Sequence, residues 1–197
     1  MAMTSNVGIL KLAEAGFLPA RIGTPLSYWV IDNTEPLSEL VNKILDKESP
    51  ILEKLAPKGH GENKYLEMIW TWWIIRMPRD WWSHFDQYRH AKQYVDDSVS
   101  LSSSTMHTLL RRHVVESDFA GECAPGTLGF LNLCIDLNQL EKAKRALPEG
   151  YLQTRVVAMN YQTLRNILLQ RSTHKLEEWQ VFCDAVRQEV EHPELLP

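Results

Sequence analysis

The stretch KRALPEGYLQTRVVAMNYQTLRNILLQRSTHKLEEWQ, residues 144–180, decides the fold because it predicts a strand that leads directly into a helix. Residues 155–159 are β-branched and compact, as a strand requires, and Asn160 then offers a side-chain oxygen that can cap a helix. Leucines at helical spacing follow, and the same stripe ends at Arg171. We therefore predict that Asn160 and Arg171 lie on one apolar face of this helix.

Arg171 has two interpretations. A cation near a helix C-terminus suits the macrodipole and commonly pairs with a neighbouring carboxylate. An arginine on an apolar stripe is also suited to hold an anionic ligand, because its planar guanidinium makes parallel hydrogen bonds. The residues around Arg171 favour the second interpretation.

Pro148, Asn160 and Arg171 form a frame of fixed spacing. Asn160 follows Pro148 by twelve residues, and Arg171 follows Asn160 by eleven. This stretch resembles the C-terminal half of the flavin-dependent thymidylate synthases, in which R-x-x-L-P precedes an asparagine and an arginine at the same spacings. Here KRALP stands for the first motif, so Lys144 replaces an arginine by a cation without a planar fork.

The resemblance implies roles for five residues around this frame. Asn160, Gln162 and Asn166 would bind the cofactor FAD, with Gln162 in a position where the family has arginine. Lys144 and Arg171 would bind the substrate dUMP, and Arg171 would also take part in catalysis.

A second frame lies upstream, in KYLEMIWTWWIIRMPRDWWSHFDQYRH, residues 64–90. Residues 66–75 are aromatic and β-branched without a breaker, which predicts a buried strand, and Pro78 suits the first turn of a following helix. The spacing resembles a glutamate, a turn and an Arg-His-Arg motif of the family, and Arg89 fits that motif with or without a one-residue insertion. The site residues that the resemblance implies here are Glu67, Tyr88, Arg89 and His90 for FAD, and His84 for the substrate.

The serine-rich run AKQYVDDSVSLSSSTMH, residues 91–107, follows this frame. Such a run is typical of a flexible loop, and Asp96 and Asp97 would repel an anion. In the family a Ser-x-Arg motif binds the nucleotide phosphate after the helix, and here Met106 and His107 stand where its arginine is expected. The resemblance implies a phosphate clamp made of Ser102, Ser103, Ser104 and Thr105, with Ser104 also in catalysis. We expect the loop over residues 91–105 to be mobile without ligand, because its small polar side chains bury little apolar surface.

Length, composition and net charge limit the number of domains and the kinds of ligand that we expect. The chain has 197 residues with 44% hydrophobic content and no glycine- or proline-rich linker, so we expect one domain over residues 1–197. A net charge of −4 gives no general attraction to nucleic acid polymers, so phosphate recognition must be local. We expect neither a signal peptide nor a membrane span.

The cysteines and histidines argue against two further classes. Three widely spaced cysteines fit reduced thiols in the cytoplasm better than a disulfide framework. The seven histidines and the cysteines form no Cys-x-x-C or His-Glu-x-x-His motif, so we expect no metal site.

The remaining pattern predicts further elements. Residues 7–13 indicate a first strand, Pro36 opens a helix, and Ser49-Pro50 opens a second short helix that ends near Gly59. Residues 127–147 carry leucines at helical spacing, which predicts a helical stretch. The last helix has an apolar stripe over residues 176–190, which is either core or a subunit contact.

Five of the seven tryptophans fall within residues 70–82. An aromatic cluster of this kind forms part of a core or contacts a flavin. Strand alternation would send Trp70 and Trp72 to one face of the sheet and Trp73 to the other, so at least one of them is available to an interface or a ligand.

We predict an α+β fold, a single domain in which a mixed sheet is packed with helices. The resemblance implies an enzyme that uses FAD, NADPH and methylenetetrahydrofolate to transfer a one-carbon unit to C5 of dUMP. It also implies a homotetramer whose sites combine several subunits. Two alternatives stay open: a C5-modifying enzyme for another pyrimidine nucleotide, and a non-catalytic nucleotide-binding protein that has lost the flavin.

Overall fold

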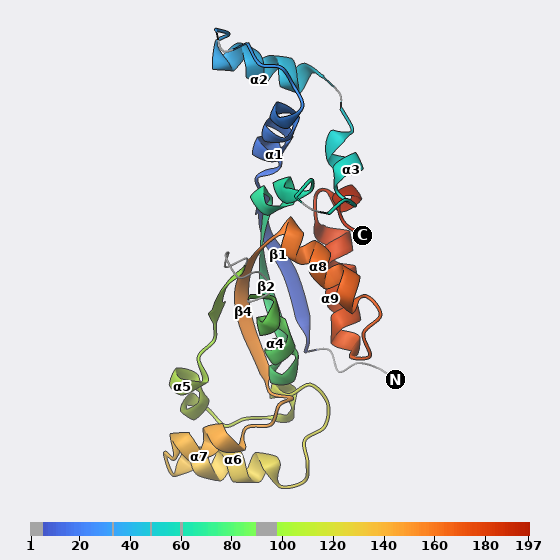
Figure 1. Cartoon of the computed structure of the whole chain (residues 1–197). Helices are drawn as coiled ribbons and strands as arrows, with labels where there is room; N and C mark the ends of the chain where they lie inside the picture. The colour runs from blue at the N-terminus through green and yellow to red at the C-terminus, as the bar shows by residue number, and fades with distance from the viewer. Residues whose placement is uncertain (1–5, 33, 48, 60, 90–97) are drawn as a thin grey trace. The chain divides into compact units, whose positions relative to one another are not determined.

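A computed structural model describes residues 6–197 apart from 33, 48, 60 and 90–97, and the side chains of residues 89, 98 and 99 also lie outside the described part. Figure 1 shows its strands and helices, which are, in chain order, β1 (Gly8–Ala15), α1 (Phe17–Gly23), α2 (Leu37–Asp46), α3 (Ile51–Leu55), β2 (Trp70–Pro78), α4 (Arg79–Phe85), β3 (Ser98–Ser102), α5 (Thr105–Thr108), α6 (Thr127–Asp136), α7 (Leu140–Ala146), β4 (Leu152–Asn160), α8 (Tyr161–Arg171) and α9 (Glu177–Glu189).

Within the described residues, the strands form one four-stranded sheet in the order β1-β2-β4-β3. β2 and β4 run antiparallel: the Tyr161 amide donates to the Ile69 carbonyl at one end (2.9 Å), and the Arg79 amide to the Tyr151 carbonyl at the other (3.1 Å). The predicted α+β class is therefore confirmed. None of the helices described is long and apolar enough to cross a membrane.

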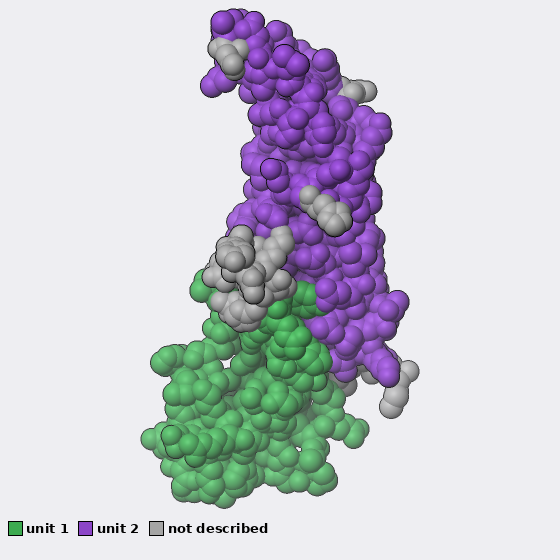
Figure 2. All heavy atoms as spheres, in the orientation of Figure 1, with its two compact units in different colours: residues 1–10, 73–157 green, residues 11–72, 158–197 purple. Residues whose placement is uncertain are grey.

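The chain divides into two compact units, shown in different colours in Figure 2. Unit 1 consists of Met1–Leu10 and Trp73–Val157, and unit 2 of Lys11–Trp72 and Ala158–Pro197. The boundaries fall inside three strands, β1, β2 and β4, and not in linkers. The expectation of a single domain stays a prediction.

Aromatic side chains form much of the core of unit 1. Trp81 and Trp82 of α4 are buried, with ring centroids 5.0 Å apart. Arg155 of β4 lies over Trp82, with its guanidinium carbon 4.2 Å from the ring centroid, and forms a 2.9 Å ion pair with Asp86. A second cluster joins α6 and α7 through buried residues that include Leu131. Trp81 and Trp82 therefore form part of the core of unit 1.

The core of unit 2 lies between α8 and α9, which are side by side in Figure 1. The apolar stripe of α9 is fully buried at Trp179, Phe182, Cys183 and Val186. Of the two alternatives for the last helix, these four residues therefore form part of the core and not a subunit contact. The alternation predicted for β2 is also confirmed, because Trp70 and Trp72 are half-buried whereas Trp73 is fully buried.

Three predicted boundaries are wrong. The aromatic strand begins at Trp70 and continues to Pro78, because Lys64–Met68 forms a 3-10 helix in place of its first residues. The short helix α3 ends at Leu55, before Gly59. The serine run is not all loop: Ser98–Ser102 forms the edge strand β3.

The predicted helical stretch over residues 127–147 is two helices, α6 and α7. Asn138 adopts the left-handed conformation (φ 54°), and the amides of Asn138 and Gln139 donate to the carbonyls of Ile135 (3.0 Å) and Cys134 (2.8 Å). These bonds form a Schellman motif, which ends α6 by satisfying its last carbonyls. Leu133 therefore lies on an exposed face of α6 and not on a continuous inner stripe.

Candidate functional site

Asn160 caps helix α8 as predicted. Its side chain is buried, with 1% exposed, and its Oδ1 accepts a hydrogen bond from the Thr163 amide at 2.9 Å. An N-cap of this kind satisfies one of the amides that a helix start leaves without an intrahelical partner. The cap fixes Asn160 at the junction between β4 and α8.

Gln162 and Asn166 form a pair on the following turns of α8. The Gln162 Nε2 donates to the Asn166 Oδ1 at 3.1 Å, and Gln162 is 9% exposed. Arg165 belongs to a different contact, because its Nε donates to the Ala56 carbonyl at 3.0 Å. The polar groups around the start of α8 are thus neutral amides, each with a donor and an acceptor.

Arg171 lies in the last turn of α8 and is half-buried. Its guanidinium carbon lies 5.0 Å from the centroid of the Trp179 ring on α9, which is within cation–π distance. The sequence did not indicate this contact, because it depends on how the two helices pack. The guanidinium group of Arg171 therefore packs against α9 in unit 2.

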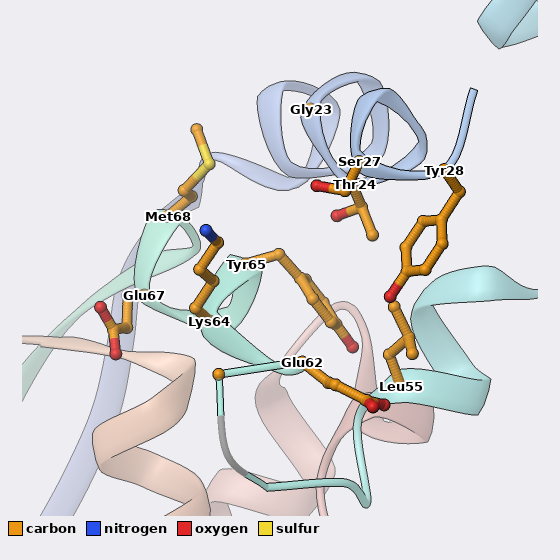
Figure 3. Close-up of a pocket in the computed structure, with 11 residues that line it drawn as sticks. Gly23, Thr24, Ser27, Tyr28, Leu55, Glu62, Lys64, Tyr65, Glu67 and Met68 are labelled. Atoms are coloured by element: carbon orange, nitrogen blue, oxygen red, sulfur yellow. The ribbon is translucent and has the colours of Figure 1, made fainter. Parts of the chain in front are cut away.

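Glu67 lines a cavity of about 640 Å³ in unit 2, which we call the Glu67 cavity. Figure 3 shows the side chains of Thr24, Ser27 and Tyr28 on one side of this cavity and those of Glu62, Lys64 and Tyr65 on the other. Gly16, at the end of β1, approaches the neighbouring 3-10 helix closely. Its φ is 103°, and a Cβ there would lie 2.0 Å from the Met68 carbonyl oxygen, so this position requires glycine.

Lys144 and Thr105 line a second cavity, of about 560 Å³, in unit 1. This Lys144 cavity is lined by Arg79, Thr105, Met106, Leu140, Glu141, Lys144, Arg145, Leu147 and Gln153. Three cations and one carboxylate line it. Arg145 pairs with Glu141 and Arg79 with Glu149, each at 3.5 Å, so the surplus of positive charge comes from Lys144. Arg79 is held in place by a 2.7 Å hydrogen bond from its Nη1 to the Leu147 carbonyl.

The four residues of the predicted phosphate clamp lie in different surroundings. Ser102 ends β3 and is exposed, and the Ser103 amide donates to the Thr154 carbonyl of β4 at 2.9 Å. Ser104 is the N-cap residue of α5, and its carbonyl accepts from the Thr108 amide at 3.1 Å. Of the four, Thr105 is the one in the lining of the Lys144 cavity. The predicted clamp is therefore anchored to β4 at Ser103.

The residues predicted at the end of α4 are described only in part. His84 is half-buried in the last turn of α4, and Tyr88 is buried, with 5% exposed, in the 3-10 helix Asp86–Arg89. The side chain of Arg89 and the whole of His90 lie outside the described residues, as do Asp96 and Asp97.

The predicted site residues divide between the two units. Unit 1 contains those of α4, the serine run and Lys144, whereas unit 2 contains Glu67 and those of α8. Sequence reasoning missed Arg79 and Arg145, which also line the Lys144 cavity. Their positions next to Pro78 and Lys144 were a weak signal, because a surface cation needs no special explanation.

Comparison with protein-family models finds no match to this sequence, and comparison with curated protein sequences finds none either. Solved structures do match. A flavin-dependent thymidylate synthase, ThyX from Helicobacter pylori complexed with FAD and dUMP, aligns with 95% of this chain and 97% of its own, at 17% identity and a TM-score of 0.72.

The chain has the fold of the flavin-dependent thymidylate synthases. A second Helicobacter pylori ThyX structure with FAD and dUMP agrees, with a TM-score of 0.69 at 17% identity over 96% of this chain and 97% of that one. The UMP/dUMP methylase PolB from Streptomyces cacaoi, bound with 5-Br dUMP, aligns with 95% of this chain and 91% of its own, at 12% identity and a TM-score of 0.63. The expected fold is thus confirmed over nearly the whole chain.

Proposed function

We propose that the protein is a flavin-dependent enzyme that transfers a one-carbon unit to C5 of dUMP, as a thymidylate synthase does. The observation that carries the proposal is the Lys144 cavity, in which Lys144 and Thr105 lie together although they are distant in sequence. The resemblance to the flavin-dependent thymidylate synthases implies a substrate-binding role for both. The shared fold of proteins solved with FAD and dUMP supports the same conclusion.

The substrate phosphate binds in the Lys144 cavity in this proposal. The ammonium of Lys144 and the guanidinium groups of Arg79 and Arg145 attract a phosphate, and the Thr105 hydroxyl donates to it. The resemblance adds Ser104, which is next to Thr105 in the chain, and Arg171, which belongs to unit 2. In this proposal all three cations that line the cavity, Arg79, Lys144 and Arg145, bind the phosphate.

The cofactor FAD is bound by the amides at the start of α8. Asn160, Gln162 and Asn166 offer alternating donors and acceptors, which fits the alternating N–H and C=O groups on the edge of a flavin ring. Aromatic rings and hydroxyls in the Glu67 cavity suit another flat part of the same cofactor. When bound, FAD supplies the electron pair that converts a transferred methylene group into a methyl group.

The co-substrates in this proposal are those that the family resemblance implies. Methylenetetrahydrofolate donates the methylene group, and NADPH returns the electron pair to the flavin. dUMP, methylenetetrahydrofolate, NADPH and a proton then yield dTMP, tetrahydrofolate and NADP⁺.

The site is completed by other subunits of a homotetramer in this proposal. Helix α6 and its C-cap residue Leu137 present an exposed apolar face, on which Phe130, Leu133 and Leu137 are 41%, 54% and 56% exposed. Their spacing forms a single stripe, which suits burial against another helix. Assembly would bury that stripe.

A second candidate reaction is C5 methylation of UMP as well as dUMP. PolB, a UMP/dUMP methylase, shares this fold over 95% of the chain. The two candidates differ in whether the site accepts a ribose 2′-hydroxyl. Parallel titrations with UMP and dUMP distinguish them, since a dUMP-specific synthase discriminates against the ribonucleotide.

The test of the proposal is reconstitution with excess FAD, followed by gel filtration with absorbance detection. We expect flavin to elute with a tetramer and dUMP to bind to that species. Colourless protein that still binds dUMP would contradict the enzymatic proposal and support a nucleotide-binding protein without flavin.

A further inference from the structure

Tyr161 is the first residue of α8 and lies between the two proposed cofactor ligands Asn160 and Gln162. Its side chain is fully buried, and its backbone amide donates to the Ile69 carbonyl at 2.9 Å. Its hydroxyl donates to the Glu14 carboxylate and accepts from the His192 amide at 3.2 Å. Both ends of Tyr161 are therefore fixed.

Glu14, on β1, is the centre of a network that reaches Tyr161. Its side chain is 2% exposed and accepts from the Lys11 Nζ at 3.1 Å and from the Glu191 amide at 2.9 Å. A buried carboxylate persists only where donors surround it, and here it has donors from three parts of the chain. We call Lys11, Glu14, Tyr161, Glu191 and His192 the Glu14 network.

The Glu14 network ties the segment after α9 to the start of α8. The amides of Glu191 and His192 both donate into it, and the His192 ring stacks on Phe17 with centroids 3.4 Å apart. Glu191 is also 3.5 Å from the Lys11 Nζ. All of these residues belong to unit 2.

The carboxylates of Glu14 and Glu191 and the ring of His192 are close enough together to suggest a metal site. The Lys11 ammonium lies within 3.5 Å of both carboxylates, however, and already neutralises charge that a metal ion would need. A metal ion there would be repelled by the ammonium. The arrangement fits a positioning role better than a binding role.

We infer that Tyr161 and Glu14 are positioning residues for the proposed cofactor ligands on α8, an inference that rests on the proposed function. The Tyr161 ring sets the rotation of the first turn, because its hydroxyl is held at Glu14 while its amide is held at Ile69. Asn160 and Gln162 flank it in the chain and turn with it. The Glu14 network thus orients the amides that contact FAD without contacting FAD itself.

The test compares Tyr161→Phe with Thr71→Val in the FAD-reconstituted full chain. Each substitution removes one buried hydroxyl from unit 2, since Thr71 is also fully buried and its hydroxyl donates to the Met159 carbonyl at 3.0 Å. We expect Tyr161→Phe to weaken FAD affinity by about tenfold, the equivalent of one hydrogen bond. Thr71→Val should leave FAD affinity at the wild-type value.

Two further variants separate positioning from stability. Glu14→Gln retains an oxygen that accepts from Tyr161, so we expect it to keep most of the FAD affinity that Glu14→Leu loses. Hydrogen exchange of the Thr163 amide adds a readout that needs no flavin, because this amide donates to the Asn160 side chain. Exchange should be faster in Tyr161→Phe than in Thr71→Val.

Weaker FAD binding and faster Thr163 exchange in Tyr161→Phe, but not in Thr71→Val, support the inference. Equal values for the two variants in both measurements overturn it. If the wild type binds no FAD, the proposed function fails, and Thr163 exchange alone decides whether Tyr161 positions the first turn of α8.

Discussion

Replacing Lys144 by alanine should weaken dUMP binding without changing the fold. Lys144 is exposed on α7 and lines a cavity with Arg79 and Arg145. A hydrogen bond to a charged group contributes about 1.5–3 kcal/mol, and the exposed position favours the lower end because solvent and salt screen it. A loss of about 1.5 kcal/mol corresponds to roughly tenfold weaker binding.

The matched control for this prediction is Lys142→Ala. Lys142 is on the same helix, but its Nζ lies 5.5 Å from the Phe130 ring centroid and outside the Lys144 cavity. Calorimetric titration of dUMP should detect the loss in Lys144→Ala and not in Lys142→Ala. Deoxyuridine, which lacks the phosphate, should bind all variants equally. Unchanged dUMP affinity in Lys144→Ala, or an equal loss for deoxyuridine, would refute the phosphate assignment.

The further predictions concern Asn160, Arg171 and the cysteines. Asn160→Ala removes a helix cap worth about 1 kcal/mol and should lower the melting temperature by about 2–4 °C. Asn160→Ser keeps a capping oxygen, so it should have the wild-type melting temperature. Its FAD affinity, measured by fluorescence titration, should still be lower than that of the wild type. Arg171→Lys should lose as much dUMP affinity as Arg171→Ala in calorimetry, because an ammonium lacks the planar edge. Burial raises the pKa of the Cys183 thiol to about 11, so alkylation at neutral pH with mass spectrometric detection should modify half-buried Cys123 first. Because the folded state favours the neutral thiol, the free energy of unfolding should fall as pH rises from the ordinary thiol pKa toward that value.

The start of α8 was predictable because its signals are local. A β-branched run, an asparagine and a helical period are adjacent in sequence, and the structure has β4, the Asn160 cap and α8 in that order. The left-handed Asn138 was readable in principle, since asparagine is a known alternative to glycine after a helix. The leucine spacing across it favoured one helix and concealed the break.

The features that the sequence did not predict depend on contacts between residues that are distant in the chain. β3 is a serine-rich edge strand with little intrinsic β-propensity, and neighbouring Ser103 is bonded to β4. The bond between Tyr161 and Glu14 joins residues 147 positions apart, and no local pattern indicates it. Arg79 and Arg145 become candidate phosphate ligands only once the chain brings them beside Lys144.

The most direct test of the central claim is a product assay. The FAD-loaded protein is incubated with dUMP, methylenetetrahydrofolate and NADPH, and the nucleotides are analysed by mass spectrometry. We predict a product heavier than dUMP by one CH₂ group, which requires all three small molecules and is formed more slowly by Lys144→Ala than by Lys142→Ala. Unaltered dUMP after incubation with a flavin-loaded, dUMP-binding tetramer would contradict the claim.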